Sequence, residues 1–224
     1  MSKLTKTSEQ QTKKSIAYEQ IRSSIINQTL PPGTPLVERT ICEALSTSRT
    51  PVREAIQQLA AEGLVDILPG NVALVSDITY DKIVEIYNIR EVLEGLAART
   101  SALLIGETQL QELGTVLECS EQTDSLQDPK TFHDCDLKFH NIIVSSCRSS
   151  MLMHHLKIIE GHVKRITWRG SSEYFSEATL EHRRIYEALC SHDPIRAEEA
   201  MRVHIRRSKQ NHLADTYHVT EGLK

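Results

Sequence analysis

The segment from residue 37 to residue 75 limits what this chain can fold into more than any other. Its apolar spacing and turn residues predict two short helices joined by a tight turn, followed by two short strands around Pro-Gly-Asn. In order, we expect a helix, a turn, a helix and two strands over residues 37–45, 46–48, 49–62, 64–68 and 72–75. This order is typical of a winged helix-turn-helix.

The second of these helices has one apolar face and one polar face. Its apolar residues recur at i, i+3, i+4 and i+7, which predicts the buried stripe Val52, Ala55, Ile56 and Leu59. Ser48 is placed to cap the helix, and Arg49, Arg53 and Gln57 lie opposite the stripe. A guanidinium can hold a guanine edge or a phosphate, so this face is a candidate DNA-reading surface. The alternative is a solvated helix face with a few charges.

A length of 224 residues suits two domains, and the pattern changes after Asp77. Beyond it, long helical segments are expected at roughly 79–105, 107–123, 130–147, 150–168, 175–190 and 195–214. Asp128-Pro129 and Asp193-Pro194 are helix starts. The predicted fold is mostly α, an N-terminal winged helix-turn-helix plus a C-terminal all-helical antiparallel bundle. The predicted boundaries are a flexible arm at 1–14, the DNA-binding domain at 15–76, the helical domain at 79–214 and a tail at 215–224.

Composition excludes several classes of protein. No apolar stretch reaches the roughly 20 residues of a membrane span, and the polar N-terminus lacks a signal-peptide core, so we expect a cytoplasmic protein without a membrane partner. Five widely spaced cysteines without a CxxC pair predict free thiols. The net charge of -4 is uneven, because residues 1–76 hold eight Lys and Arg against seven Asp and Glu, and the remainder 18 against 23. This distribution leaves DNA binding open.

Histidines form the other distinctive pattern. Asp136 and His140 are four residues apart and so project from one helix face, as two ligands of a single metal ion do. His182 and His204 each share an apolar stripe and are expected to face inward. A metal would satisfy the buried imidazoles together, whereas the alternative is separate core histidines with their own partners. The other histidines, at 133, 154, 155, 162, 192, 212 and 218, are predicted to be surface or incidental residues.

The stretch from Ile16 to Val75, which contains PPGTPLVERTICEALSTSRTPVREAIQQLAAEGLV, resembles the N-terminal domain of the GntR family of bacterial regulators. The resemblance implies DNA contact through Arg39, Arg49, Thr50, Arg53 and Gly70. Ser46 and Thr47 stand where the family often has Gly-Val, which restricts the turn conformation without removing a DNA-reading group.

Residues 79–214 resemble the FCD ligand-binding domain of the FadR branch of that family, in which a helical bundle often holds a metal on one Asp and three His. The segments FHDCDLKFH, EHRRI and MRVH carry the resemblance, which implies the metal ligands Asp136, His140, His182 and His204. Three imidazoles and a carboxylate suit zinc, nickel or another borderline divalent ion, and zinc is our prediction.

Arg90 falls on the arginine of the family's IRxxLE segment, where a cation would suit a carboxylate effector bound at the metal. A helical ion pair with Glu94 is the alternative role.

The chain is therefore predicted to be a regulator and not an enzyme. It would bind two-fold related half-sites of an operator as a homodimer, under the control of a small carboxylate. A metal-dependent hydrolase and a metal-free dimerisation scaffold are the rival functions. An appended DNA reader has no obvious use in a simple hydrolase.

Overall fold

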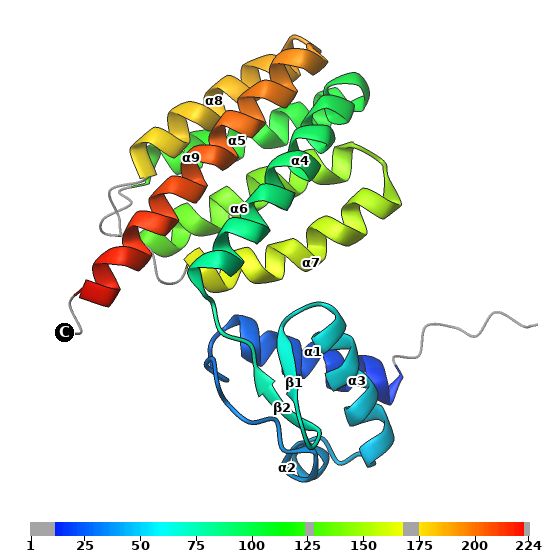
Figure 1. The fold of residues 1–224 in the computed structure, drawn as a ribbon. Helices are drawn as coiled ribbons and strands as arrows, with labels where there is room; N and C mark the ends of the chain where they lie inside the picture. The colour runs from blue at the N-terminus through cyan, green and yellow to red at the C-terminus, as the bar shows by residue number, and fades with distance from the viewer. Residues whose placement is uncertain (1–11, 124–127, 168–174, 222–224) are drawn as a thin grey trace, which may run out of the picture. The chain divides into compact units, whose positions relative to one another are not determined.

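The computed structural model describes residues 12–123, 128–167 and 175–221, and the chain divides into two compact units between Ile78 and Thr79 (Figure 1). The smaller unit consists, in order, of α1 (Lys13–Ile26), α2 (Glu38–Ala44), α3 (Arg49–Ala61), β1 (Val65–Leu68) and β2 (Val72–Val75). The larger unit consists of α4 (Tyr80–Leu104), α5 (Glu107–Gln122), α6 (Pro129–Ser146), α7 (Ser150–Thr167), α8 (Phe175–Cys190) and α9 (Pro194–Glu221). The predicted fold class is confirmed, since the described chain is mostly helical with a two-stranded wing.

The smaller unit is built on an apolar core between α1, α3 and the hairpin. The predicted stripe of α3 is buried, and Ile21 and Ile25 of α1 pack against it. β1 and β2 pair antiparallel from Val65 opposite Val75 to Leu68 opposite Val72. The hairpin is the expected wing.

Left-handed backbone occurs at two turns that belong to the predicted motif. Gly70, at the wing turn, has φ +83°, and Asn71 follows with φ +60°. Ser46, between α2 and α3, has φ +47°, a conformation that glycine adopts more easily than serine. Ser48 occupies the N-cap position of α3, but its side chain makes no capping hydrogen bond, so that part of the prediction is wrong.

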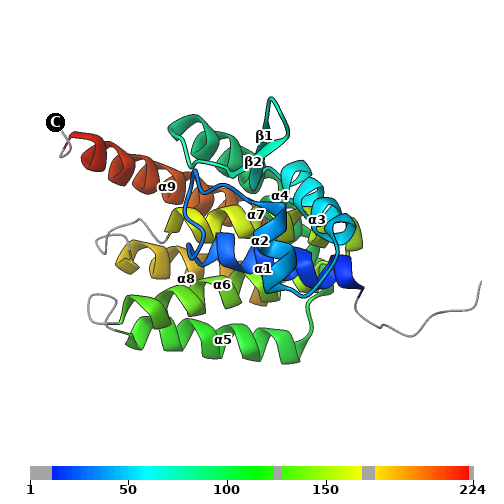
Figure 2. The same cartoon turned by 90° about the horizontal axis from the view of Figure 1, so that it is seen from below.

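In the larger unit α4 is the central helix and packs against α6, α7, α8 and α9. α8 and α9 run side by side, as do α5 and α6 (Figures 1 and 2). Side-chain caps start three of the helices where the sequence permits them. Thr79 accepts from the Lys82 N–H at 3.2 Å, Asp128 from Thr131 at 3.1 Å, and Asp193 from Ile195 and Arg196 at 3.1 and 3.0 Å.

Several expectations need correction. α9 continues to Glu221 beyond the expected end at residue 214, and α1 begins at Lys13, inside the expected arm, whose residues 1–11 lie outside the described residues. His162 and His212 are buried and not superficial. His212 contacts the Tyr87 hydroxyl at 3.1 Å, because helix packing places α9 against α4. The side chain of His218 lies outside the described ones.

The cysteines are free thiols, as predicted. No helix in the described ranges combines the length and hydropathy that a membrane span requires.

Candidate functional site

The polar face of α3 is open to solvent, as the sequence predicts. Arg49, Thr50, Arg53 and Gln57 are all exposed, on the side of the helix opposite its buried stripe. Glu38 at the start of α2 holds Arg53 in a two-bond fork, in which Nε donates to Oε1 at 2.9 Å and Nη2 to Oε2 at 3.0 Å. The guanidinium beside Glu38 lowers the pKa of that carboxyl. The guanidinium plane is thereby oriented.

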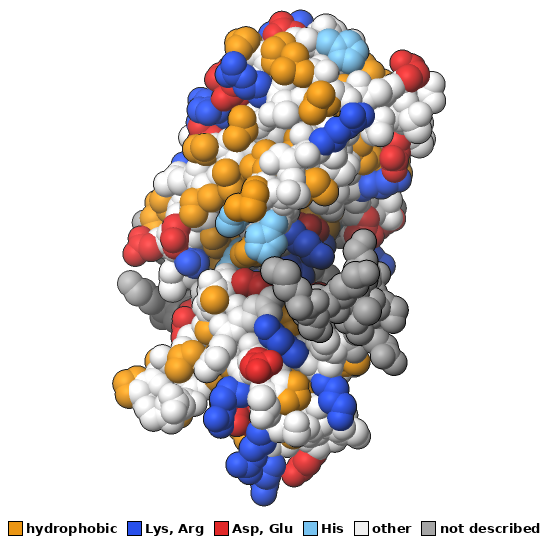
Figure 3. All heavy atoms as spheres, turned by 90° about the vertical axis from the view of Figure 1, so that its right-hand side faces the viewer, with side chains coloured by type: hydrophobic (Ala, Val, Ile, Leu, Met, Phe, Trp, Pro, Cys, Tyr) orange, Lys and Arg blue, Asp and Glu red, His pale blue; other side chains and the backbone are white. Residues whose placement is uncertain are grey.

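The other two candidate DNA contacts are also accessible. Arg39 on α2 is exposed, and its nearest charged partner is Glu43 at 3.8 Å. Gly70 lies at the tip of the wing, with open space where a Cβ would be. Figure 3 shows Lys and Arg side chains gathered at one end of the smaller unit. Local positive charge of this kind attracts phosphates even when a domain is nearly neutral.

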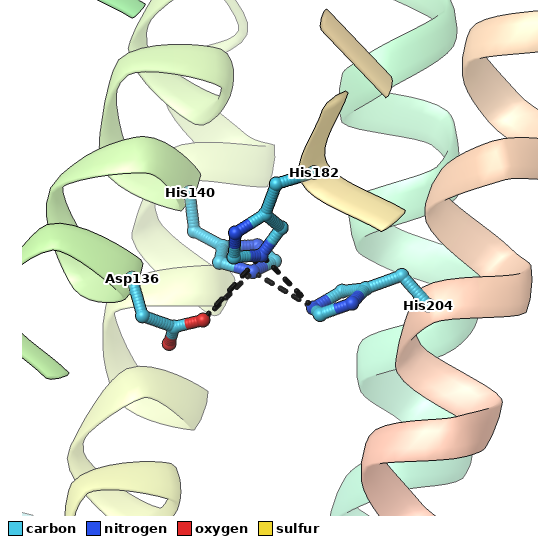
Figure 4. A group of neighbouring side chains, drawn as sticks. All are labelled: Asp136, His140, His182 and His204. Atoms are coloured by element: carbon cyan, nitrogen blue, oxygen red, sulfur yellow. Dashed lines mark hydrogen bonds and ion pairs between the residues drawn. The ribbon is translucent and has the colours of Figure 1, made fainter. Parts of the chain in front are cut away.

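The four predicted metal ligands meet inside the larger unit. Asp136 and His140 come from α6, His182 from α8 and His204 from α9, and their side chains point toward one another (Figure 4). One ligand atom of each lies within 4.8 Å of all the others. His204 Nε2 is 3.2 Å from His140 Nε2 and 3.3 Å from His182 Nε2, and Asp136 Oδ1 is 3.4 Å from His182 Nε2.

These separations fit a bound ion. Bonds of about 2.0 Å to a tetrahedral zinc place neighbouring ligand atoms about 3.3 Å apart. Three of the separations between these atoms, at 3.2, 3.3 and 3.4 Å, are close to this spacing, and His140 Nε2 is 3.8 Å from Asp136 Oδ1. His182 and His204 are 1% exposed and His140 is 7% exposed, so little solvent reaches the imidazoles.

Carboxylates on the outer side orient two of the imidazoles. Glu94 of α4 lies 2.5 Å from His140 Nδ1, and Glu181 of α8 lies 2.9 Å from His204 Nδ1. Each carboxylate accepts a proton held on Nδ1, which leaves a lone pair on Nε2 facing the centre. A carboxylate that accepts from the outer ring nitrogen is the usual support of a metal-ligating histidine.

Electrostatics favour a cation at the centre. Burial, and then the neighbouring His140, lowers the pKa of His204 to about 3, and burial lowers the pKa of His182 well below its ordinary value. Burial opposes ionisation of Asp136, yet the surrounding imidazoles and Arg90 hold its pKa below the usual range. A carboxylate and neutral imidazole nitrogens therefore converge, and their lone pairs repel unless a cation lies between them.

Arg90 makes the helical ion pair that was one of the two roles considered for it, and its effector-binding role stays a prediction. It is buried and forms an ion pair with Glu94, one turn further along α4. Its Nη2 is also 3.4 Å from His140 Nε2, at the edge of the four-residue cluster. Burial raises the pKa of Glu94, but Arg90 and the hydrogen bond with His140 outweigh it and bring that pKa down to about 2.

Sequence reasoning missed the orienting role of Glu94 and Glu181 altogether. Glu94 was considered only as a partner of Arg90, and Glu181 was not singled out although it directly precedes His182. Glu181 supports His204, on another helix, so only the packing of α8 on α9 reveals it.

Two family descriptions match the chain. The family described as "Bacterial regulatory proteins, gntR family" matches residues 13–75, and the one described as "FCD domain" matches residues 85–207. These ranges contain the exposed face of α3 and the four-residue cluster, respectively.

Two relatives are 30% identical to the chain. The "Probable D-xylose utilization operon transcriptional repressor" of Paenarthrobacter nicotinovorans aligns over 89% of this chain and 89% of its own length. The "Gluconate operon transcriptional repressor" of Bacillus subtilis aligns over 80% of this chain and 75% of its own length. Among solved structures, E. coli McbR/YncC has a TM-score of 0.74 at 18% identity, over 92% of this chain and 99% of that one, and so shares the fold.

Proposed function

This chain belongs to the gntR family of bacterial regulatory proteins and carries an FCD domain, and we propose that it is a dimeric repressor whose operator affinity is set by a small carboxylate bound at a metal ion. It is a transcription regulator and not an enzyme, because its families and relatives are regulators. The names of both relatives favour repression over activation. The proposed limits are 15–76 for the DNA-binding domain and 79–214 for the effector domain.

The observation that carries the proposal is the pairing, in one chain, of an exposed arginine face with a closed Asp-His cluster. On the DNA side, α3 is the recognition helix, with Arg49, Thr50 and Arg53 directed to bases and phosphates. Arg39 on α2 and Gly70 in the wing would add contacts with the DNA backbone. The fork with Glu38 supports a preset orientation of Arg53.

Replacing Arg53 by Ala tests the reading face. We expect operator affinity to fall roughly 10- to 100-fold, with an almost unchanged melting temperature, because the side chain faces solvent. The probe is a duplex that the wild-type protein selects from a random-sequence library. Arg183→Ala is the matched control, since Arg183 is also exposed and holds a carboxylate, Glu121, in a fork on the helical unit. Equal affinities of the Arg53 and Arg183 variants would remove α3 from the reading role.

On the metabolite side, Asp136, His140, His182 and His204 would hold the ion, with zinc as the proposed identity. Such an ion supplies a Lewis acid that binds a carboxylate oxygen. Arg90 would orient the same ligand, because its guanidinium reaches the edge of the cluster. Gluconate, in the name of the Bacillus relative, is itself a carboxylate, which supports this class of effector.

Metal content and melting test the cluster. Protein purified without chelator should carry one divalent ion per chain, and chelation should lower its melting temperature because the ion joins three helices. His204→Ala should lose the ion, whereas the control His154→Ala, at an exposed position on α7, should keep it. If the wild-type protein carries no divalent ion and chelator leaves melting unchanged, the four residues are core groups and the metal-free scaffold is the better description.

An apolar stripe on α4 supports the homodimer. Ile89, Val92, Leu96 and Leu103 are exposed at helical spacing on one side of this helix. A second copy of the chain would bury such a stripe, and a two-fold dimer places two recognition helices on two half-sites. A native mass spectrum of protein purified without chelator measures the mass of the assembly, which we expect to be that of two chains.

A further inference from the structure

Two cysteines of the helical unit lie against each other across a helix pair. Cys119 is near the end of α5 and Cys135 is near the start of α6, and their sulfur atoms are 3.1 Å apart. A disulfide bond is about 2.05 Å long, so the sulfurs need to approach by only about 1 Å. The other cysteines, Cys42, Cys147 and Cys190, have no sulfur contact of this kind among the described residues.

The register of α5 and α6 brings this pair together. The two helices pack antiparallel as neighbours, and Lys138 Nζ of α6 contacts Glu112 Oε1 of α5 at 3.1 Å, about two turns from Cys119. This ion pair and the cysteine pair both fit a single antiparallel register of α5 against α6. Cys119 is exposed and Cys135 half-buried, so a small solute reaches the thiols from solvent.

We propose that Cys119 and Cys135 are a modification site, a thiol pair that a peroxide converts into a reversible disulfide between α5 and α6. The more exposed Cys119 reacts first. Its sulfur attacks one peroxide oxygen, the O–O bond breaks, and a sulfenic acid and one water form. The Cys135 sulfur then attacks the Cys119 sulfur and expels the second water. In total two thiols lose two hydrogens, and one hydrogen peroxide is reduced to two waters.

The disulfide would form directly beside the four-residue cluster of the helical unit. Cys135 directly precedes Asp136, so the crosslink ties to α5 the turn of α6 that contributes a carboxylate to the four-residue cluster. Intracellular disulfides are mostly transient and serve sensing more often than scaffolding. Oxidation would thus give the regulator an input separate from its metabolite, and this consequence rests on the proposed function.

Peptide mapping of the full-length protein tests the pair. Purified protein is treated with hydrogen peroxide, alkylated and digested with trypsin without reductant. Trypsin cleaves after Arg99, Lys130 and Lys138, so the disulfide joins peptide 100–130 to peptide 131–138. We expect this linked species to become the main form of both peptides, with an intact mass lower by about 2 Da. Dithiothreitol should restore the separate peptides.

Single variants sharpen the test. Cys135→Ser should abolish the linked species and raise dimedone trapping of a sulfenic acid at Cys119 at least roughly tenfold, because the resolving thiol is gone. Cys190→Ser, which removes another exposed thiol, should leave the yield unchanged. The proposal is overturned if wild-type protein gives no 100–130/131–138 link, or if either peptide joins a different cysteine or a second chain. The wild-type map decides this even if a variant folds poorly.

Discussion

The two units place their charged groups in opposite ways. In the smaller unit the core is apolar, and the arginines assigned to DNA lie on the surface. In the larger unit the interior holds Arg90, Glu94, Glu181, His182 and His204. Among the described residues, every buried charged or imidazole side chain belongs to this second unit.

In the smaller unit the proposed functional side chains contribute little to stability. In the larger unit the same side chains serve both the proposed site and the stability of the fold. A surface arginine can change without loss of a core contact, since solvent replaces what it touched. A buried charge has no such replacement, and removing its partner leaves it desolvated and unpaired. The smaller unit should therefore keep its stability when a functional side chain is substituted, whereas the helical unit should not.

The largest effect should follow from Glu94→Gln. This change keeps the volume but leaves the buried Arg90 guanidinium without its anion and weakens the support of His140, so we expect the helical unit to lose about 3–5 kcal/mol. Calorimetry that resolves the unfolding transitions of the two units measures this loss of stability. Glu121→Gln, at the exposed pair with Arg183, should hardly move the same transition. If the two variants melt alike, the buried pair is not a stability element and the contrast between the units fails.

The next largest effect concerns the stability of the smaller unit. Ile56 is 3% exposed in the apolar core, and Ile56→Ala should cost that unit about 2–5 kcal/mol through lost burial and a cavity. DNA binding would then fall through unfolding, in contrast to Arg53→Ala, which should lower affinity without a change in melting. Only the transition of the smaller unit should shift. A matching shift in the helical unit would mean that the two do not unfold independently.

The smallest effect is a response to mild acid. The pKa of His204 is lowered to about 3 and that of His182 is also lowered, so the folded imidazoles stay neutral while unfolded ones take up protons below about 6.5. The stability they carry is complete above about pH 6.5 and is lost as the pH falls toward the folded values.

Acidification from pH 7.5 to 5.5 should accordingly cost the chelator-treated helical unit about 1.4 kcal/mol for each such imidazole. Residues 1–78 contain no histidine, so the unfolding midpoint of the smaller unit should not change over this pH interval. Denaturant unfolding at the two pH values makes the comparison, and a larger acid loss in the smaller unit would contradict it.

The sequence predicted the fold well where the signals are local. The apolar stripe of α3, the Asp-Pro helix starts and the glycine at the wing are written in neighbouring residues, and the structure has them. A limit appears at the ends of elements. Ser48 has the residue type and position of a cap but lacks the capping hydrogen bond.

The candidate site divides along the same line. The sequence by itself determined that Asp136 and His140 share a helix face, because a spacing of four is a geometric property of any α-helix. Only the tertiary structure decided that α6, α8 and α9 meet at one point, that Glu94 and Glu181 orient the imidazoles there, and that Cys119 touches Cys135. The physical reason is range: helical periodicity and caps arise within a few residues, whereas the register of one helix on another is the sum of many weak packing contacts between distant segments.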